Sequence, residues 1–311
     1  MSSSEIAKVS IIEITDPVCS IAWGMEPKRR LLQWRYAERI NWRVVTCGLI
    51  GDLSNADDWA PNMTKEIYAQ GYQKVWASVS KFTGMPYAQK LQYMPMTTVI
   101  PSKVVKAAQY QGGSVRDKVL RRFREQVFIY GTPVDDVKNI ESALQGISGL
   151  DIPRLLIDFN SQQLKEDFHQ DWQESRSPNA YVKRLALQGI DRIKGPSIVS
   201  EGHERFALPT FIINGPCGEI TIPGWRDYNE LESAIEQVLP GFIREKDRTN
   251  PTPEEAFACW DSMTEQEMNA ICCTTEVPSQ LAEKHTLGDT CIWMNTNESA
   301  FLNAKQQAAM P

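Results

Sequence analysis

A strand, a helix and a second strand follow one another in the first 50 residues, and this order most constrains the fold. The β-branched run Lys8–Asp16 is typical of a buried strand. Helical spacing of apolar residues extends over Ser20–Arg39, with Pro27 expected to interrupt its first turns. A second apolar strand is predicted at Trp42–Leu49. This βαβ unit requires two parallel strands joined by a right-handed crossover.

The rest of the chain predicts a helical insertion and a return to strands. Residues 60–195 carry helical periodicity broken by Pro and Gly. Ala207–Asn214 and Glu219–Trp225 then predict an antiparallel hairpin, followed by a helix over Asp227–Leu239. The tail contains two helix starts of the capping-box type, at Thr252 and Thr264.

These parts assemble into an α/β fold of the thioredoxin type. The first and last parts supply a four-stranded mixed sheet covered by helices, and the middle is inserted between them. We therefore predict a thioredoxin-like domain over 8–59 and 196–240, an inserted all-helical domain over 60–195, and a C-terminal helical extension over 241–311.

Composition narrows the class of function. The net charge of −6 disfavours charge-driven binding to nucleic acid or to an anionic membrane. The N-terminus lacks the pattern of a signal peptide, and no apolar run approaches the roughly 18 residues of a membrane span. The seven cysteines are therefore expected to be mostly reduced thiols in the cytoplasm. Their spacing, and that of the three histidines, predicts no metal site.

The segment DPVCSIAWG around Cys19 resembles the active-site segment DPxCSWCWG of the DsbA family. The closest branch contains the cytosolic FrnE-like oxidoreductases and is related to kappa-class glutathione transferases and 2-hydroxychromene-2-carboxylate isomerases. CGLIG is similar to the GGL turn of that branch, and LPTFIIN to its cis-proline strand. The resemblance covers residues 8–51 and 197–240. It implies a cis peptide bond before Pro209, with Leu208, Pro209 and Trp23 framing a substrate pocket.

Cys19 is the candidate catalytic residue. It lies where a strand ends and a helix begins, so the unpaired N–H groups and positive end of the helix dipole would stabilise a thiolate. We predict that the thiol is partly or wholly ionised at neutral pH. The alternative is an inert buried cysteine, a common fate of free cysteines.

Ala22 stands where the second cysteine of a dithiol site is expected, and Ile21 replaces the family's Trp. A Cys-x-x-Cys mechanism is therefore excluded, and three hypotheses remain. In the first, Cys19 acts as a monothiol, and glutathione or another small thiol resolves the intermediate. In the second, Cys47 resolves it, because parallel strands end at the same edge of a sheet. Cys217 lies too far along its strand, and nothing fixes the geometry of the tail cysteines.

In the third hypothesis the chain has lost redox chemistry and acts as an adaptor for a partner protein. Our first choice is a thiol oxidoreductase, or a glutathione-assisted isomerase or transferase, acting on a small, fairly apolar substrate. The helical block suits either role, since an aromatic and methionine-rich run could line an apolar groove or fill the block's own core. That run comprises Trp59, Met63, Tyr68, Tyr72, Trp76, Met85, Tyr87, Tyr93, Met94 and Met96.

One further segment of the helical block is strongly basic. Arg116–Glu125 carries four arginines on a predicted helix. We expect a solvated face, with binding of a carboxylate such as that of glutathione as the alternative.

Overall fold

The structure is a computed structural model that describes residues 9–51, 65–91, 95–188, 198–200, 203–287, 290–295 and 299. The chain packs as two units. One comprises Met1–Cys47 with His169–Asn250, and the other comprises Gly48–Phe168 with Pro251–Pro311. The described residues after 250, which are 251–287, 290–295 and 299, therefore pack with the helical block. The three-part domain division made from the sequence stays a prediction.

The first unit contains the predicted mixed sheet, which we call the sheet unit. Strands β1 (Val9–Thr15) and β2 (Ile40–Thr46) pair in parallel, from Val9 opposite Ile40 to Thr15 opposite Thr46. Strand β5 (Thr210–Gly215) runs antiparallel to β1, and β6 (Gly218–Pro223) antiparallel to β5. The strand order is β2-β1-β5-β6, so the parallel βαβ unit and the C-terminal hairpin share one sheet.

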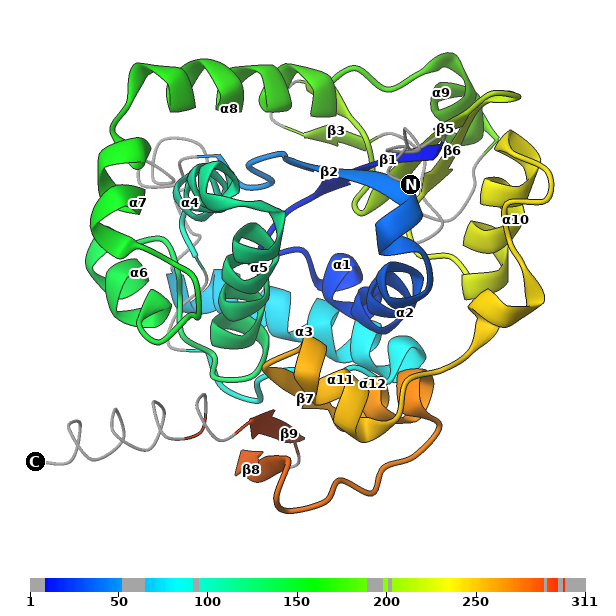
Figure 1. Cartoon of the computed structure of the whole chain (residues 1–311). Coiled ribbons are helices and arrows are strands. Elements are labelled where there is room, and N and C mark those ends of the chain that lie inside the picture. The colour runs from blue at the N-terminus through cyan, green and yellow to red at the C-terminus, as the bar shows by residue number, and fades with distance from the viewer. Residues whose placement is uncertain are drawn as a thin grey trace, which may run out of the picture. The chain divides into compact units, whose positions relative to one another are not determined.

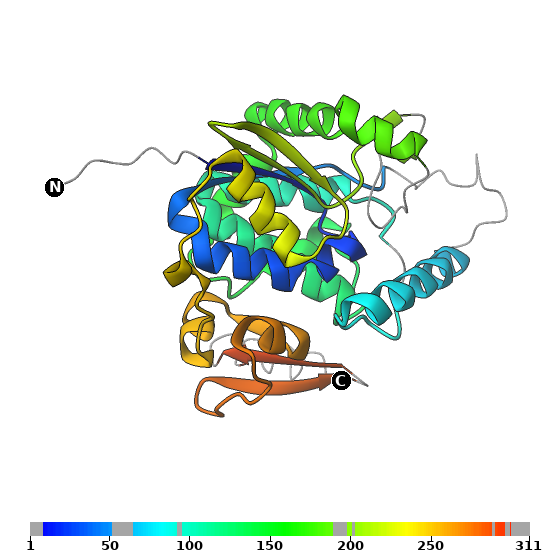
Figure 2. The ribbon, with the colours of Figure 1, turned by 90° about the vertical axis from the view of Figure 1, so that its right-hand side faces the viewer.

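Helices cover both faces of this sheet (Figures 1 and 2). Helix α2 (Glu26–Tyr36) and α10 (Tyr228–Val238) lie on one face, and α9 (Ala180–Leu187) with the end of α8 (Gln162–Ser175) lies on the other. The α2–α10 face holds an apolar core that includes Ile11, Phe211 and Ile235. The predicted first helix is divided in two: α1 (Ser20–Gly24) ends at Met25, and Pro27 occupies the first turn of α2.

A short hairpin in the sheet unit was not predicted. Strands β3 (Ile198–Ser200) and β4 (His203–Arg205) pair antiparallel with each other and form a separate two-stranded sheet. Three-residue strands are too short to show a periodic pattern in the sequence.

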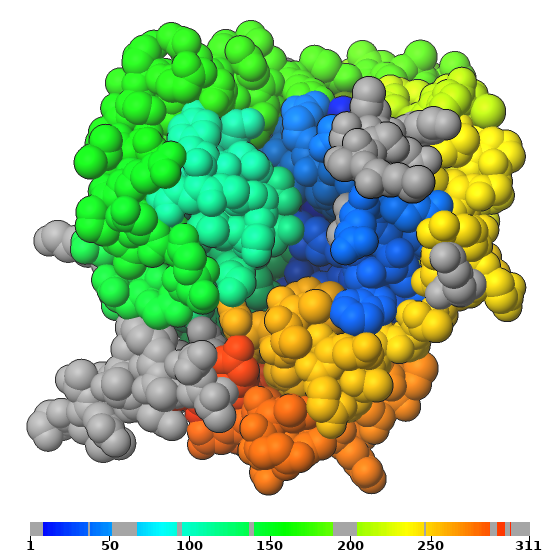
Figure 3. Space-filling model, in the orientation of Figure 1, coloured from blue at the N-terminus to red at the C-terminus, as the bar shows by residue number. Residues whose placement is uncertain are grey.

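The second unit, which we call the helical unit, begins with the predicted helical block. In the space-filling view the surface over α4 to α7 is continuous (Figure 3). Its helices before α8 are α3 (Lys65–Thr83), α4 (Val99–Ala108), α5 (Gly113–Phe128), α6 (Val137–Leu144) and α7 (Ile152–Phe159).

The C-terminal segment of the helical unit combines short helices with a small sheet. Both predicted capping boxes are confirmed, at Thr252 before α11 (Pro253–Cys259) and at Thr264 before α12 (Glu265–Glu267). A π-helical turn, η5, continues α12 over Met268–Cys272. The prediction of a helical extension did not foresee the antiparallel sheet of order β7-β9-β8. Its strands are β7 (Ser262–Thr264), β8 (Ala282–Leu287) and β9 (Thr290–Asn295).

The basic segment of α5 is buried, so the expectation of a solvated face was wrong. Arg124 has no exposed surface, and Arg116, Arg121 and Arg122 are at most 6 % exposed. Polar groups of the same unit contact several of these guanidinium groups, and Arg116 pairs with Asp117. Arg121 pairs with Glu125 and Glu267, and Arg122 donates to the carbonyl of Ala143 at 2.6 Å.

Part of the aromatic and methionine run fills the core of the helical unit. Trp76 and Met85 are buried, and Trp76 packs edge-on against Phe128. Tyr68, Tyr72, Tyr87 and Met96 are partly buried. Trp59, Met63, Tyr93 and Met94 lie outside the described residues.

Candidate active site

Cys19 lies at the junction predicted from the sequence, between β1 and α1. A tight turn precedes it: the Asp16 carboxylate accepts a hydrogen bond from the Val18 N–H at 2.9 Å, and the Asp16 carbonyl accepts one from the Cys19 N–H at 3.3 Å. Cys19 is the N-cap of α1, with extended backbone angles and no side-chain capping bond. The Cys19 sulfur therefore does not cap the N–H groups of α1.

The sulfur faces the strand that carries Pro209. The Cys19 thiol donates to the carbonyl oxygen of Leu208, with Sγ 3.6 Å from that oxygen. The peptide bond between Leu208 and Pro209 is cis, the form implied by the family resemblance. The Pro209 carbonyl in turn accepts from the Gly224 N–H at 2.7 Å, which ties this segment to the end of β6. Cys19 is 6 % exposed, so only a small part of its surface is open to a reacting molecule.

Cys47 lies at the same edge of the sheet, directly after β2. Its N–H donates to the Thr15 carbonyl at 3.0 Å, and its Sγ lies 4.0 Å from a carboxylate oxygen of Asp16. Burial raises the pKa of the Cys47 thiol well above its ordinary value, and Asp16 raises it further. The charges of Cys19 and Cys47 also act on each other. The structure thus places the two thiols in one neighbourhood and keeps Cys47 protonated at neutral pH.

Two basic groups that sequence analysis missed flank Cys47. Arg176 donates to the Cys47 carbonyl at 2.8 Å, and both Arg176 and Arg205 act to lower the pKa of the Cys47 thiol. Arg205 is 7 % exposed and donates to the Phe206 carbonyl at 2.9 Å. Neither arginine belongs to a local motif, so no sequence signal marked them. Both arginines therefore place positive charge near the Cys47 thiol.

The other predicted site residues are largely buried. Trp23 is 2 % exposed within α1, and Leu208 is 6 % exposed. The residue that ends α1, Met25, belongs to the apolar core of the α2–α10 face. Cys217 lies at the turn of the β5–β6 hairpin and is exposed, as are Cys259 and Cys273. All seven cysteines are free thiols.

The raised pKa of Cys47 predicts a loss of stability at alkaline pH. In the unfolded chain this thiol ionises near its ordinary pKa of about 8.5, whereas in the folded chain it keeps its proton to higher pH. The free energy of unfolding should therefore fall above about pH 8.5, by at most about 1.4 kcal/mol per pH unit from this group. Urea denaturation between about pH 8.5 and 10 should show a shallower fall for Cys47→Val.

The matched control is Cys217→Val, which replaces an exposed thiol and should leave the slope unchanged. Burial also raises the pKa of Cys272, to about 11, but this contribution is common to all three proteins. Equal slopes in the parent and in Cys47→Val would contradict the assignment.

Metal-binding groups and membrane-spanning helices can be considered for the described residues. No group of three or more His, Cys, Asp or Glu side chains among them is arranged to hold a metal ion. None of the described helices combines the length and the apolar character that crossing a membrane requires.

The site can be compared with known proteins. A family model described as thioredoxin (Thioredoxin_5) matches residues 14–178. A curated relative named ClpXP adapter protein SpxH, from Shouchella clausii, is 24 % identical over 49 % of this chain and 48 % of its own length. The protein of the same name from Halalkalibacterium halodurans is 24 % identical over 68 % of each chain. The chain thus matches about half the length of the first of these relatives.

A solved structure has the same fold. A protein from Nitrosomonas europaea, described as a putative protein disulfide isomerase, superposes with a TM-score of 0.54 at 17 % identity. The superposition covers 76 % of this chain and all of the other. At this identity the likeness establishes the fold alone.

Proposed function

This chain belongs to the thioredoxin family, and from that membership we propose that it performs thiol-disulfide chemistry with Cys19 as its single nucleophile. The observation that carries the proposal is the position of the Cys19 sulfur. It lies at the start of α1 and 3.6 Å from the Leu208 carbonyl, beside the cis bond to Pro209. This is where a thiol can meet an extended substrate backbone.

The reaction needs a second thiol from outside the chain. The Cys19 thiolate attacks one sulfur of a disulfide R–S–S–R′, forms a Cys19–S–S–R bond and releases R′–S⁻. A small thiol such as glutathione then attacks the sulfur of R, which restores the Cys19 thiolate and forms a new disulfide with R. One disulfide is consumed and one is formed, so electrons balance. Ala22 has no sulfur with which to perform the second step.

Cys47 is a poorer choice for that second step. Its thiol has no exposed surface and its pKa is raised by burial, whereas the attacking species in exchange is the thiolate. An external thiol does not require the buried Cys47 thiol to lose its proton. The same Cys19 with bound glutathione suits isomerisation or transfer of a small apolar substrate, as in the FrnE-like and kappa-class branch that the motif resembles. The segment that leads to Pro209 is apolar and buried at Phe206, Ala207 and Leu208.

Peptide mapping after reaction with glutathione disulfide tests the proposal. The full chain is incubated at neutral pH, blocked with iodoacetamide and digested without reduction. We expect one glutathione on the Cys19 peptide, removed by added glutathione. A Cys19–Cys47 bridge would instead assign the second step to Cys47. Absence of any disulfide at Cys19 in the folded protein would overturn the proposal.

A second candidate function is that of an adaptor for a partner protein. It is favoured by the curated relatives, which are named as ClpXP adapters, and by the 6 % exposure of Cys19. An adaptor binds through surface complementarity and does not need the sulfur. Partner capture unchanged by Cys19→Ser, together with an unreactive Cys19, would favour this role.

A further inference from the structure

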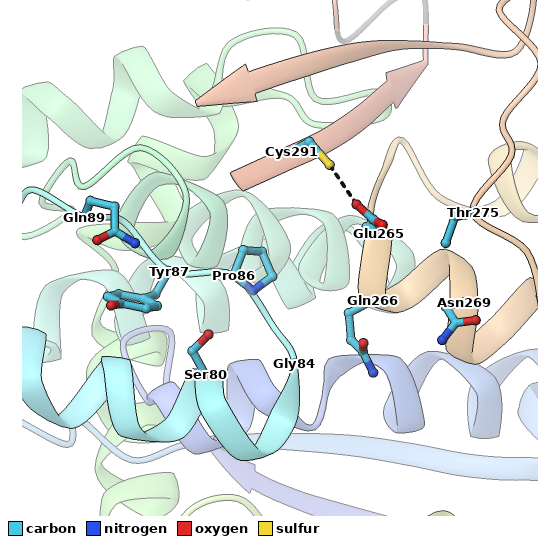
Figure 4. Close-up of a pocket in the computed structure, with 10 residues that line it drawn as sticks. All are labelled: Ser80, Gly84, Pro86, Tyr87, Gln89, Glu265, Gln266, Asn269, Thr275 and Cys291. Atoms are coloured by element: carbon cyan, nitrogen blue, oxygen red, sulfur yellow. Dashed lines mark hydrogen bonds between the residues drawn. The ribbon is translucent and has the colours of Figure 1, made fainter. Parts of the chain in front are cut away.

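The helical unit contains a polar cavity of about 560 Å³ (Figure 4). Its walls come from the end of α3 and the loop after it, and from α12, η5 and β9. The volume lies within the range of about 300–1,000 Å³ usual for ligand pockets. The lining residues are Ser80, Gly84, Pro86, Tyr87, Gln89, Glu265, Gln266, Asn269, Thr275 and Cys291.

Helix α12, which supplies much of this wall, is fixed by buried contacts on the side away from the cavity. Glu267 of α12 has no exposed surface and forms two hydrogen bonds with Arg121, at 2.8 and 2.9 Å. Thr264 caps the helix and donates to the sulfur of Met85 at 3.4 Å. Glu265, Gln266 and Asn269 therefore project from a fixed base, and binding need not first order the helix.

The turn at the wall of the cavity is one that favours glycine at position 84. This glycine has a φ of +74°, and a Cβ there would lie 2.7 Å from Oε1 of Gln266. The positive φ strains any residue other than glycine, and a Cβ would also force the end of the Gln266 side chain to move. The loop after α3 and helix α12 thus lie against each other at the wall of the cavity.

The lining contains one formal charge. Glu265 is the only acidic residue among the ten, none of which is Lys, Arg or His, and its carboxylate accepts a hydrogen bond from the Cys291 thiol at 3.4 Å. Burial raises the pKa of Cys291, and Glu265 raises it further, so the thiol stays neutral. Lys284, outside the lining, acts in the opposite sense on the Cys291 thiol. Among the lining residues, the carboxylate of Glu265 is therefore the group that suits a cation.

The uncharged groups suit the backbone of a peptide. Gln89, Gln266 and Asn269 each carry both an amide donor and an amide acceptor, which complement the N–H and C=O of a peptide bond. We propose that this cavity binds a short peptide segment that presents an arginine or lysine side chain to Glu265. The site lies within the helical unit and uses no group of the Cys19 site.

Fluorescence polarisation with labelled tripeptides on the full chain tests the proposal. The probe is acetyl-Gly-Arg-Gly-amide, compared with the citrulline and glutamate versions. Because Glu265 is exposed, we expect the citrulline peptide and the Glu265→Gln variant each to weaken binding by about three- to fivefold, an effect that added salt reduces. The control variant Glu276→Gln removes an exposed carboxylate outside the lining and should bind normally.

A second readout uses the thiol in the wall. Binding should slow alkylation of Cys291 by iodoacetamide and leave that of exposed Cys273 unchanged. Cys19→Ser should bind the peptide as the parent does, which separates this proposal from the proposed function.

Three results would overturn the proposal. The first is equal affinity for the arginine and glutamate peptides, and the second is no binding. The third is L-argininamide binding as tightly as the tripeptide, since the site would then recognise a small cation and not a peptide.

Discussion

Replacing Arg121 with methionine should lower the free energy of unfolding by about 3–5 kcal/mol. Arg121 is 6 % exposed and makes two hydrogen bonds to Glu267, which has no exposed surface. It also pairs with Glu125 at 2.6 Å, and Glu125 accepts from the Ser262 hydroxyl. Removing the guanidinium takes its charge and its hydrogen bonds away from two buried carboxylates, and this penalty exceeds the gain from an apolar side chain. Urea denaturation of the full chain measures the change.

Two variants make this prediction specific. Arg154→Met removes an exposed arginine paired with Asp158 and should change the free energy of unfolding by less than about 1 kcal/mol. The double variant Arg121→Met with Glu267→Met also removes the buried Glu267 carboxylate. It should recover part of the lost free energy of unfolding. A change below about 1 kcal/mol for Arg121→Met alone would show that the buried pair does not join the C-terminal segment to α5.

The elements predicted correctly are those with local signals. β1, β2 and the β5–β6 hairpin carry apolar runs bounded by turns, and Asp227, Thr252 and Thr264 begin helices through capping boxes. The strand over Trp42–Leu49 was placed a few residues late, since β2 ends at Thr46. A strand ends where its pairing with the neighbouring strand ends, and the sequence of one segment does not reveal that neighbour.

The features that were missed depend on partners far apart in the chain. The arginines of α5 suggested a solvated face because Glu267, the partner of Arg121, lies 146 residues away. In the β7-β9-β8 sheet, β7 (Ser262–Thr264) pairs with Ile292–Met294 of β9, about 30 residues later in the chain. Local periodicity cannot indicate such pairings.

The sequence indicated where several candidate residues lie, and their roles stay predictions. Cys19 and the cis bond at Pro209 followed from the family resemblance, and the nearness of Cys47 followed from two parallel strands ending at one edge. The roles of Arg176 and Arg205 could not be predicted, because each reaches Cys47 only through the tertiary fold. Asp16 was visible in the DPVC motif, but its contact with Cys47 was not.

Replacing Cys19 with serine should abolish the proposed thiol chemistry. A serine hydroxyl has nearly the shape of the thiol and can keep the hydrogen bond to Leu208, so the fold should survive. It cannot form a disulfide, and turnover should fall on the order of 10³-fold or more. The matched control is Cys217→Ser, which removes an exposed thiol at the β5–β6 turn and should retain full activity. Cys47→Ser should retain most of the activity if an external thiol resolves the intermediate.

The central claim is that Cys19 acts as a nucleophile, and its most direct test is the turnover of a chromogenic glutathione mixed disulfide with glutathione as the reductant. The measurement compares the parent chain with folded Cys19→Ser and Cys217→Ser. We predict turnover by the parent and by Cys217→Ser, and background rates for Cys19→Ser. Equal rates in all three proteins, or no rate above background in the parent, would contradict the claim.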